Sequence, residues 1–184
     1  IAQSATSNVD AVFTFMPGGL GVRFVKQVEA AGLSDKMKFL SAFTVDETTL
    51  PAQKDAAVGL FGAGTWAPDF DLDRSKAFVA NFEAKYGYVP GSYAMQAYDA
   101  ALLIDSAVSA VGGDVSDKAG LKAALKAAKF DSMRGTFKFN VNQYPIQDFY
   151  LLNIAKRPDG KYQTEIAQKI LTGSGDSFAA ECKM

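Results

Sequence analysis

The chain has 184 residues, 48% of them hydrophobic, so it is long enough to bury one good core and falls within the size range of a single domain. Nineteen basic and twenty acidic side chains give a formal net charge of -1, so the chain lacks the excess of positive charge that is typical of proteins that bind DNA or RNA. There is no histidine and only one cysteine, Cys182, which excludes histidine-based catalysis and zinc binding, a thiolate metal cluster and an internal disulfide in this chain.

The first part of the chain predicts a parallel β-α-β arrangement. A strand, a helix and two further strands are expected in turn at residues 11–15, about 20–31, 38–42 and within 56–66. The residues before the first strand predict the tail of a helix. The first strand is expected to be buried, and the third to be buried on both faces, as is typical of parallel strands between helical layers. Such short connections favour right-handed crossovers.

The rest of the chain is helical and then returns to strands. Three helices are expected, at residues 74–86, about 93–111 and 117–128, and three short strands within 135–142, 147–156 and 161–168. No uninterrupted apolar run approaches the roughly 18 residues needed to span a bilayer. The first ten residues lack the basic and apolar regions of a signal peptide.

A glycine-rich turn, "FMPGGLG", joins the first strand to its helix. It matches neither nucleotide-binding pattern, because Phe24 stands where G-x-G-x-x-G needs its third glycine and no G-x-x-x-x-G-K-[ST] is present. The pair Gly18 and Gly19 can still bring bare backbone N–H groups close to a ligand. A tight turn without a ligand is the alternative interpretation.

Five segments in order carry a family resemblance: "FMPGG", "FVKQVEAAGL", "PAQKDAAVGLFGAGTWAPD", "KAFVANFEAKYGYVPGSYAMQAYDAALLIDSAV" and "MRGTFKFN". From about residue 9 to 166 the chain resembles the C-terminal half of a type I periplasmic solute-binding protein of an ABC importer, in the branched-chain amino acid (Leu/Ile/Val) class. The most specific piece is Y-x-x-Q-A-Y-D-A at 93–100. The resemblance implies α/β lobes with doubly wound parallel sheets, joined by three crossovers around a ligand cleft.

The resemblance also implies how the residues are shared between two lobes. Residues 1–65 are expected in the C-terminal lobe, 66–73 in a crossover, 74–132 in the N-terminal lobe, and 133–184 in a second crossover and the last strands of the C-terminal lobe. The remainder of both lobes is expected outside this chain. An oxidising periplasm would allow Cys182 to pair with a cysteine there.

The candidate binding residues follow from the place of the cleft. Ligands of open α/β sheets bind beyond the carboxyl ends of the strands, where the turn formed by Met16, Pro17, Gly18 and Gly19 is expected. Amino-acid-binding members of the family carry an acidic residue after the second strand of this stretch, which pairs with the ligand ammonium. Here Phe43 and Thr44 occupy that place.

An aromatic ring in place of a charge favours a flat aromatic ligand over an α-amino acid. Trp66 and Tyr93 are further candidate contacts, and Arg134 is a candidate for binding a carboxylate through two hydrogen bonds. Core packing is the alternative for the aromatic side chains, and a solvated position beside a turn is the alternative for Arg134.

The function implied is capture of a small carboxylate, expected to be aromatic, by a periplasmic protein that closes around it and delivers it to a membrane permease. This needs no catalytic group, metal or cofactor, and no enzyme is expected. A branched-chain amino acid binder and a ligand-sensing regulatory domain of the same fold remain alternatives. An enzyme would depend on scattered carboxylates, whose spacing requires no facing pair, namely Asp46, Glu47, Asp69, Asp71 and Asp73; the last three are better explained as helix-capping residues.

Overall fold

The structure is a computed structural model that describes residues 9–182. Its strands are β1 Ala11–Thr14, β2 Lys38–Ala42, β3 Phe61–Gly64, β4 Lys138–Phe139, β5 Pro145–Lys156 and β6 Tyr162–Ser174. Its helices are α2 Gly19–Ala30, α3 Leu50–Gln53, α4 Asp73–Tyr86, α5 Ser92–Ala110 and α6 Lys118–Ala127, with 3-10 turns η1 Lys54–Ala57 and η2 Ala179–Glu181. Within these residues no helix is long and apolar enough to cross a membrane. The helix tail predicted before the first strand lies outside the described residues.

The six strands form one mixed sheet. β1, β2 and β3 pair in parallel, and β5 continues the sheet antiparallel to β3. β4 and β6 each pair antiparallel with β5. The parallel pairing confirms the predicted β-α-β arrangement. Because parallel strands run the same way, the carboxyl ends of β1, β2 and β3 lie at one edge, where ligands of such sheets bind.

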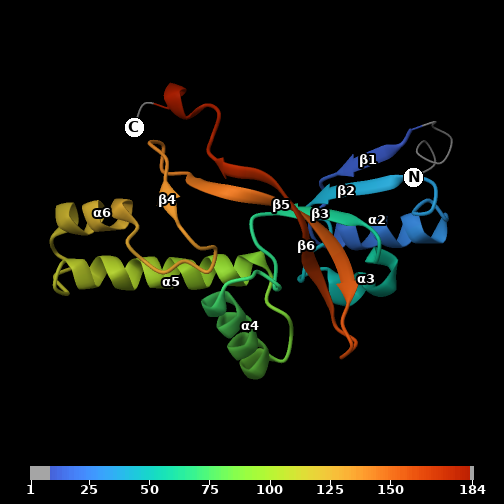
Figure 1. Ribbon diagram of the computed structural model, residues 1–184, viewed down its shortest axis with the longest axis horizontal. Coiled ribbons are helices and arrows are strands. Elements are labelled where there is room, and N and C mark those ends of the chain that lie inside the picture. Colours follow the sequence, from blue (N-terminus) through green and yellow to red (C-terminus); the bar gives the residue numbers. More distant parts are fainter. Residues whose placement is uncertain (1–8, 183–184) are drawn as a thin grey trace.

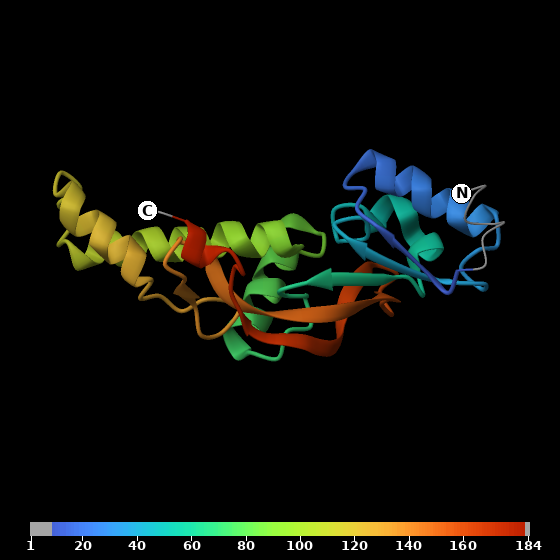
Figure 2. The same cartoon turned by 90° about the horizontal axis from the view of Figure 1, so that it is seen from above.

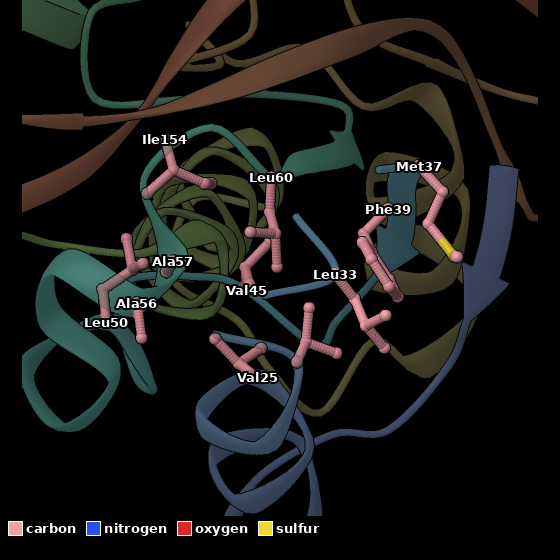
Figure 3. Close-up of a cluster of buried hydrophobic side chains, with 11 residues drawn as sticks. Val25, Leu33, Met37, Phe39, Val45, Leu50, Ala56, Ala57, Leu60 and Ile154 are labelled. Atoms are coloured by element: carbon pink, nitrogen blue, oxygen red, sulfur yellow. The ribbon is translucent and has the colours of Figure 1, made fainter. Parts of the chain in front are cut away.

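One hydrophobic cluster lies between α2 and the parallel strands (Figure 3). Val25 and Val28 are fully buried because their spacing places both on the inner face of α2. They pack in the cluster with Leu33, Phe39 and, from β5, Ile154. Burying one large apolar side chain contributes about 1.5–3 kcal/mol. This cluster therefore fastens β5 to the parallel strands.

A second cluster holds the helical part of the chain. Its buried members are Trp66, Phe78 of α4, Met95 of α5 and Met133. Figures 1 and 2 show an elongated molecule with α5 and α6 toward one end and α2 and α3 at the other. The long ribbon of β5 and β6 extends between these helix groups.

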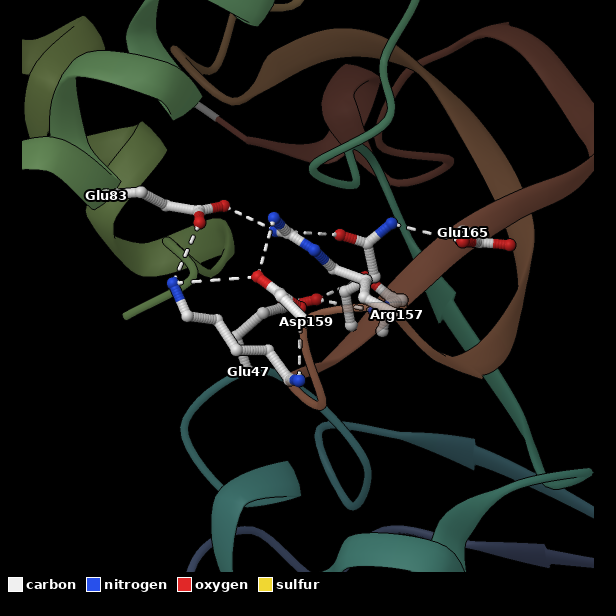
Figure 4. Close-up of polar contacts among 8 residues, drawn as sticks. Glu47, Glu83, Arg157, Asp159 and Glu165 are labelled. Carbon is white, nitrogen blue, oxygen red and sulfur yellow. Dashed lines mark hydrogen bonds and ion pairs between the residues drawn. The ribbon is translucent and has the colours of Figure 1, made fainter. Parts of the chain in front are cut away.

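Ion pairs tie α4 to the turn between β5 and β6 (Figure 4). The carboxylate of Glu83 accepts hydrogen bonds from Arg157 at 2.5 Å and from Lys161 at 3.0 Å, and Arg157 also pairs with Asp159 at 3.1 Å. Partial burial raises the pKa of Glu83, but the two cations lower it more, so that it lies below its usual range. These contacts hold the tip of the hairpin against the helix.

Three strand predictions need correction. β1 is not buried: among its residues only Thr14 is buried and Phe13 is 68% exposed, because β1 lies at the edge of the sheet. β3 is buried only at Gly62, since Ala63 opens onto a groove. Of the three last strands β4 is short, as predicted, but β5 and β6 are not: they have 12 and 13 residues and pair with each other along most of their length, with bulges where the register shifts.

Candidate functional site

A groove of about 260 Å³ opens beyond the carboxyl ends of β2 and β3, beside the start of α5 and the middle of β5. Its apolar walls include Phe43, Ala63, Tyr93, Phe149 and Leu152. Its polar lining includes Asp46, Glu47, Thr48, Thr65, Ser92, Gln96 and Gln147. Of the binding residues predicted from the sequence, Phe43 and Tyr93 line this groove.

Three aromatic rings from distant parts of the chain meet at the rim of the groove. The rings of Phe43 and Tyr93 stack with centroids 5.8 Å apart and an interplanar angle of 26°. Phe15, just after β1, meets Phe43 edge to face at 6.0 Å. All three side chains are exposed. Exposed rings that contact one another offer an apolar surface against which another ring can pack.

The backbone of Phe43 is strained. Its φ is 54°, in the left-handed region that side chains other than glycine seldom adopt. Such strain costs on the order of 1–3 kcal/mol and persists only where the surrounding structure imposes it. Here the imposed conformation turns the chain sharply at the end of β2. Strained residues gather at functional sites, so the observation supports a role for Phe43 beyond packing.

Thr44, next to Phe43, connects neighbouring segments through hydrogen bonds. It is 1% exposed, and its Oγ1 accepts a hydrogen bond from the backbone N–H of Met16 at 2.9 Å. Its carbonyl oxygen accepts one from Nε2 of Gln53 at 2.8 Å. The first bond joins the turn after β1 to the loop after β2, and the second joins that loop to the end of α3. Thr44 therefore lies next to the groove but outside its lining.

The glycine-rich turn lies at the predicted edge of the sheet. Met16 is half-buried, while Pro17, Gly18 and Gly19 are exposed, and none of the four lines the groove. Gly18 has a φ of 67° and leads directly into α2. A contact between this turn and a ligand stays a prediction.

At Gly21, which the sequence does not single out as a site residue, the main chain of α2 lies very close to the loops after β1 and β2. A Cβ atom there would lie 2.1 Å from the carbonyl oxygen of Met16 and 3.1 Å from that of Thr44. The start of α2 can therefore pack on both loops of the site only because this position has no side chain.

Trp66 lies outside the groove. Its side chain is fully buried, and its indole N–H donates to Oγ of Ser75 at 2.8 Å. The ring packs edge to face on Phe78 at 6.1 Å. The side chain of Trp66 is thus packed and hydrogen-bonded in the core of this structure. Core packing was the alternative to ligand contact for this residue.

Glu47 is a groove residue whose role the sequence did not reveal. It is 6% exposed, and its Oε1 accepts hydrogen bonds from the backbone N–H and the hydroxyl of Thr164 on β6, at 2.7 and 2.6 Å (Figure 4). Burial raises the pKa of Glu47, against the lowering effect of the two bonds from Thr164, and the neighbouring Asp46 raises it further. Glu47 thus joins the loop after β2 to the hairpin.

Glu47→Gln is expected to remove a pH-dependent contribution to stability. A raised pKa in the folded state means that the contribution is fully present below the unfolded value, near 4.5, and is lost as the pH rises through the folded value. As the pH rises from 4 to 8, the free energy of unfolding of the wild type should therefore fall relative to that of Glu47→Gln. Urea denaturation at both pH values measures this, and Glu29→Gln on the exposed face of α2 controls for the loss of one negative charge. An equal difference at both pH values would contradict the expectation.

Arg134 is not a solvated arginine beside a turn. Its side chain is 11% exposed, and its Nε lies 3.2 Å from Oδ2 of Asp99, which is 3% exposed. Asp99 also accepts hydrogen bonds from Oγ of Ser132 at 2.6 Å and from the backbone N–H of Met133 at 2.8 Å. This buried pair joins α5 to the segment before β4. Direct contact of Arg134 with a ligand carboxylate, for which it was a candidate, stays a prediction.

Two of the remaining carboxylates make contacts away from this groove. Asp69 accepts a bond from the backbone N–H of Ile166 at 3.0 Å, and Asp71 pairs with Lys76 at 2.5 Å, so these two carboxylates do not act as the expected caps of α4. Between residues 9 and 182, no group of three or more histidine, cysteine or acidic side chains could hold a metal ion. A larger, mainly apolar hollow of about 730 Å³ lies between α4 and α5 and contains none of the predicted binding residues.

Comparisons with known proteins identify the fold family. Residues 1–161 match the family described as periplasmic binding protein. The solute binding protein of an ABC transporter from R. palustris, in complex with benzoate, is 34% identical with a TM-score of 0.88, covering 100% of this chain and 49% of that one. A solute binding protein from Rhodopseudomonas palustris BisB5, in complex with 3,4-dihydroxy benzoic acid, is 28% identical with a TM-score of 0.83, covering 96% of this chain and 48% of that one.

A more distant match shows the fold alone. The leucine-, isoleucine-, valine-, threonine- and alanine-binding protein from Brucella ovis is 19% identical with a TM-score of 0.76, covering 94% of this chain and 45% of that one. No curated protein matches the chain. The chain spans about half the length of these solved structures. The predicted type I α/β fold is confirmed, whereas the branched-chain amino acid class is not, and the chain belongs to the periplasmic binding protein family.

Proposed function

We propose that this chain is part of an extracytoplasmic solute-binding protein of an ABC importer, which captures a small aromatic carboxylate. The observation that carries the proposal is the stacked pair of Phe43 and Tyr93 at the carboxyl edge of the sheet. A ring at position 43 can pack against a ligand ring but cannot supply the charge that an ammonium group needs. The benzoate-bound and dihydroxybenzoate-bound relatives, at 34% and 28% identity, support the same ligand class.

The other wall of the binding cleft is proposed to come from residues outside this chain. On this proposal residues 74–132 belong to the second lobe, together with the large apolar hollow between α4 and α5. Tyr86 and Tyr98, which line that hollow, are 51% and 46% exposed, which is consistent with a surface that other residues cover. A ligand that contacts both lobes only in the closed state shifts the population toward that state. The closed protein then delivers the ligand to its permease, and no chemical step is required.

Phe43→Ala is expected to weaken benzoate binding by about 1–3 kcal/mol, which corresponds to roughly 5- to 150-fold in Kd. The loss follows from the apolar ring surface that the ligand would no longer cover. Isothermal titration of benzoate into the whole binding protein, wild type and variant, measures it. Phe13→Ala is the matched control, because Phe13 is an exposed ring on β1 outside the groove, and its removal should leave the Kd unchanged.

A branched-chain amino acid binder is the second candidate, favoured by Asp46 and Glu47 in the groove lining, where a carboxylate could meet an ammonium group. Titration of leucine into the same wild-type protein separates the two. Binding of benzoate without leucine supports the aromatic proposal. Binding of leucine alone, or unchanged benzoate affinity in Phe43→Ala, contradicts it.

A further inference from the structure

We propose that Gln147 presents its amide NH2 group to the groove and donates a hydrogen bond to a neutral oxygen on the ligand ring, a hydroxyl or an ether. This end of the groove would thereby select oxygenated aromatic acids over unsubstituted ones. The inference rests on the proposed function, since it names the substituent that the same groove recognises.

The orientation of the amide follows from its neighbour. Nη1 of Arg134 lies 2.6 Å from Oε1 of Gln147. A guanidinium group has donors and no acceptor, so the amide atom that faces it must be the carbonyl oxygen. The NH2 group consequently points the other way. No hydrogen bond from this NH2 group to another of the residues 9–182 is found, so both of its hydrogens are available to a ligand.

Arg134 is itself held in place, and this fixes the orientation of the Gln147 amide. Its Nε pairs with the buried Asp99 at 3.2 Å, and its guanidinium lies 4.9 Å from the centre of the Phe137 ring. A charged donor also polarises the amide to which it binds, which strengthens the bond that the NH2 group can make on its other side.

The position of Gln147 suits contact with a ring substituent. It lines the groove together with Phe149 and Thr65, and also lines an adjoining hollow of about 300 Å³ that contains Arg134. The register pairs Gly64, the last residue of β3, with Tyr150, so Gln147 lies beyond the carboxyl end of β3. The amide therefore stands at the end of the groove, between the aromatic walls and the buried arginine.

The charges in the groove favour a neutral oxygen over a carboxylate at this place. The lining includes the acidic side chains of Asp46 and Glu47 and, among the described residues, neither lysine nor arginine. The cation nearest to Gln147 is Arg134, which is already paired with Asp99 and bonded to the amide oxygen, so a ligand carboxylate beside Gln147 would have no free counter-ion there. A hydroxyl or ether oxygen accepts from the NH2 group without needing a counter-ion, and a site built to hydrogen-bond such an oxygen discriminates against the analogue that lacks it.

Isothermal titration of benzoate, 3-hydroxybenzoate and 4-hydroxybenzoate into the whole binding protein, of which this chain is a part, tests the inference. The wild type should bind at least one hydroxybenzoate about tenfold more tightly than benzoate, as expected for one buried hydrogen bond. Gln147→Met keeps the length of the side chain but removes the donors, so it should abolish this preference while changing benzoate affinity less than about threefold. Gln168→Met, at an exposed position of β6, is the matched control and should keep the preference.

Each other outcome has a definite meaning. A wild type that binds benzoate but shows no preference for a hydroxybenzoate overturns the inference and leaves the proposed function standing. So does a preference that survives in Gln147→Met, or an equal loss of affinity for all three ligands in that variant. A wild type that binds none of the three overturns the proposed function and the inference together.

Discussion

Asp99→Ala is expected to lower the free energy of unfolding by about 3–5 kcal/mol, the range for removing one partner of a buried ion pair. The carboxylate accepts three hydrogen bonds, from Ser132, Met133 and Arg134, at 2.6, 2.8 and 3.2 Å. Alanine would leave a guanidinium that is 11% exposed without its counter-ion, and two further donors without an acceptor. Urea denaturation of the protein measures the loss.

The same helix provides the control for this substitution. Asp105→Ala removes an exposed carboxylate from α5 and should change the free energy of unfolding by no more than about 0.5 kcal/mol. Asp99→Asn should fall between the two, because an amide can replace some of the acceptors but not the charge. A loss below about 1 kcal/mol for Asp99→Ala would show that the pair is not buried in solution as it is in the structure.

Gly21→Ala is expected to destabilise the protein by about 1–3 kcal/mol, as overpacking does in a close-packed interior. The new methyl group would lie 2.1 Å from the carbonyl oxygen of Met16, an atom of the main chain that cannot rotate away as a side chain would. Either α2 or the turn after β1 must move. Because that turn is bonded to Thr44, next to Phe43, benzoate binding should weaken as well. Thermal unfolding and titration measure the two effects.

Gly19→Ala tests whether the cause is the contact rather than the loss of a glycine. Gly19 is the first residue of α2, and a Cβ there would meet no atom within 4 Å. Alanine is the better helix former by about 1 kcal/mol, so Gly19→Ala should leave stability unchanged or raise it slightly. Equal losses for the two substitutions would show that the close approach at Gly21 does not limit the packing.

The local structure of this chain could be predicted from the sequence. Hydrophobic spacing predicted the helices now seen as α2, α4, α5 and α6 and the strands β1, β2 and β3, mostly to within a residue or two. These elements depend on periodicities of 3.6 and 2 residues, which are properties of neighbouring side chains. The order of segments was also sufficient for the family resemblance, since each segment keeps its residue types in the sequence.

Contacts between distant residues were decided by the tertiary structure. Phe43 was a candidate, but its stacking on Tyr93 needs β2 and α5 to meet, and Glu47 bonds to Thr164, 117 residues away. Trp66 was a candidate contact with core packing as the alternative, and its side chain is fully buried; the sequence left both open because nothing local distinguishes a core indole from an exposed one. The same limit applies to Gly21, because a side chain is excluded there only by the two loops that approach it in the folded structure. Local spacing thus determined the elements, whereas the pairing of β5 with β3 and the approach of α5 to the loop after β2 determined which side chains share the groove.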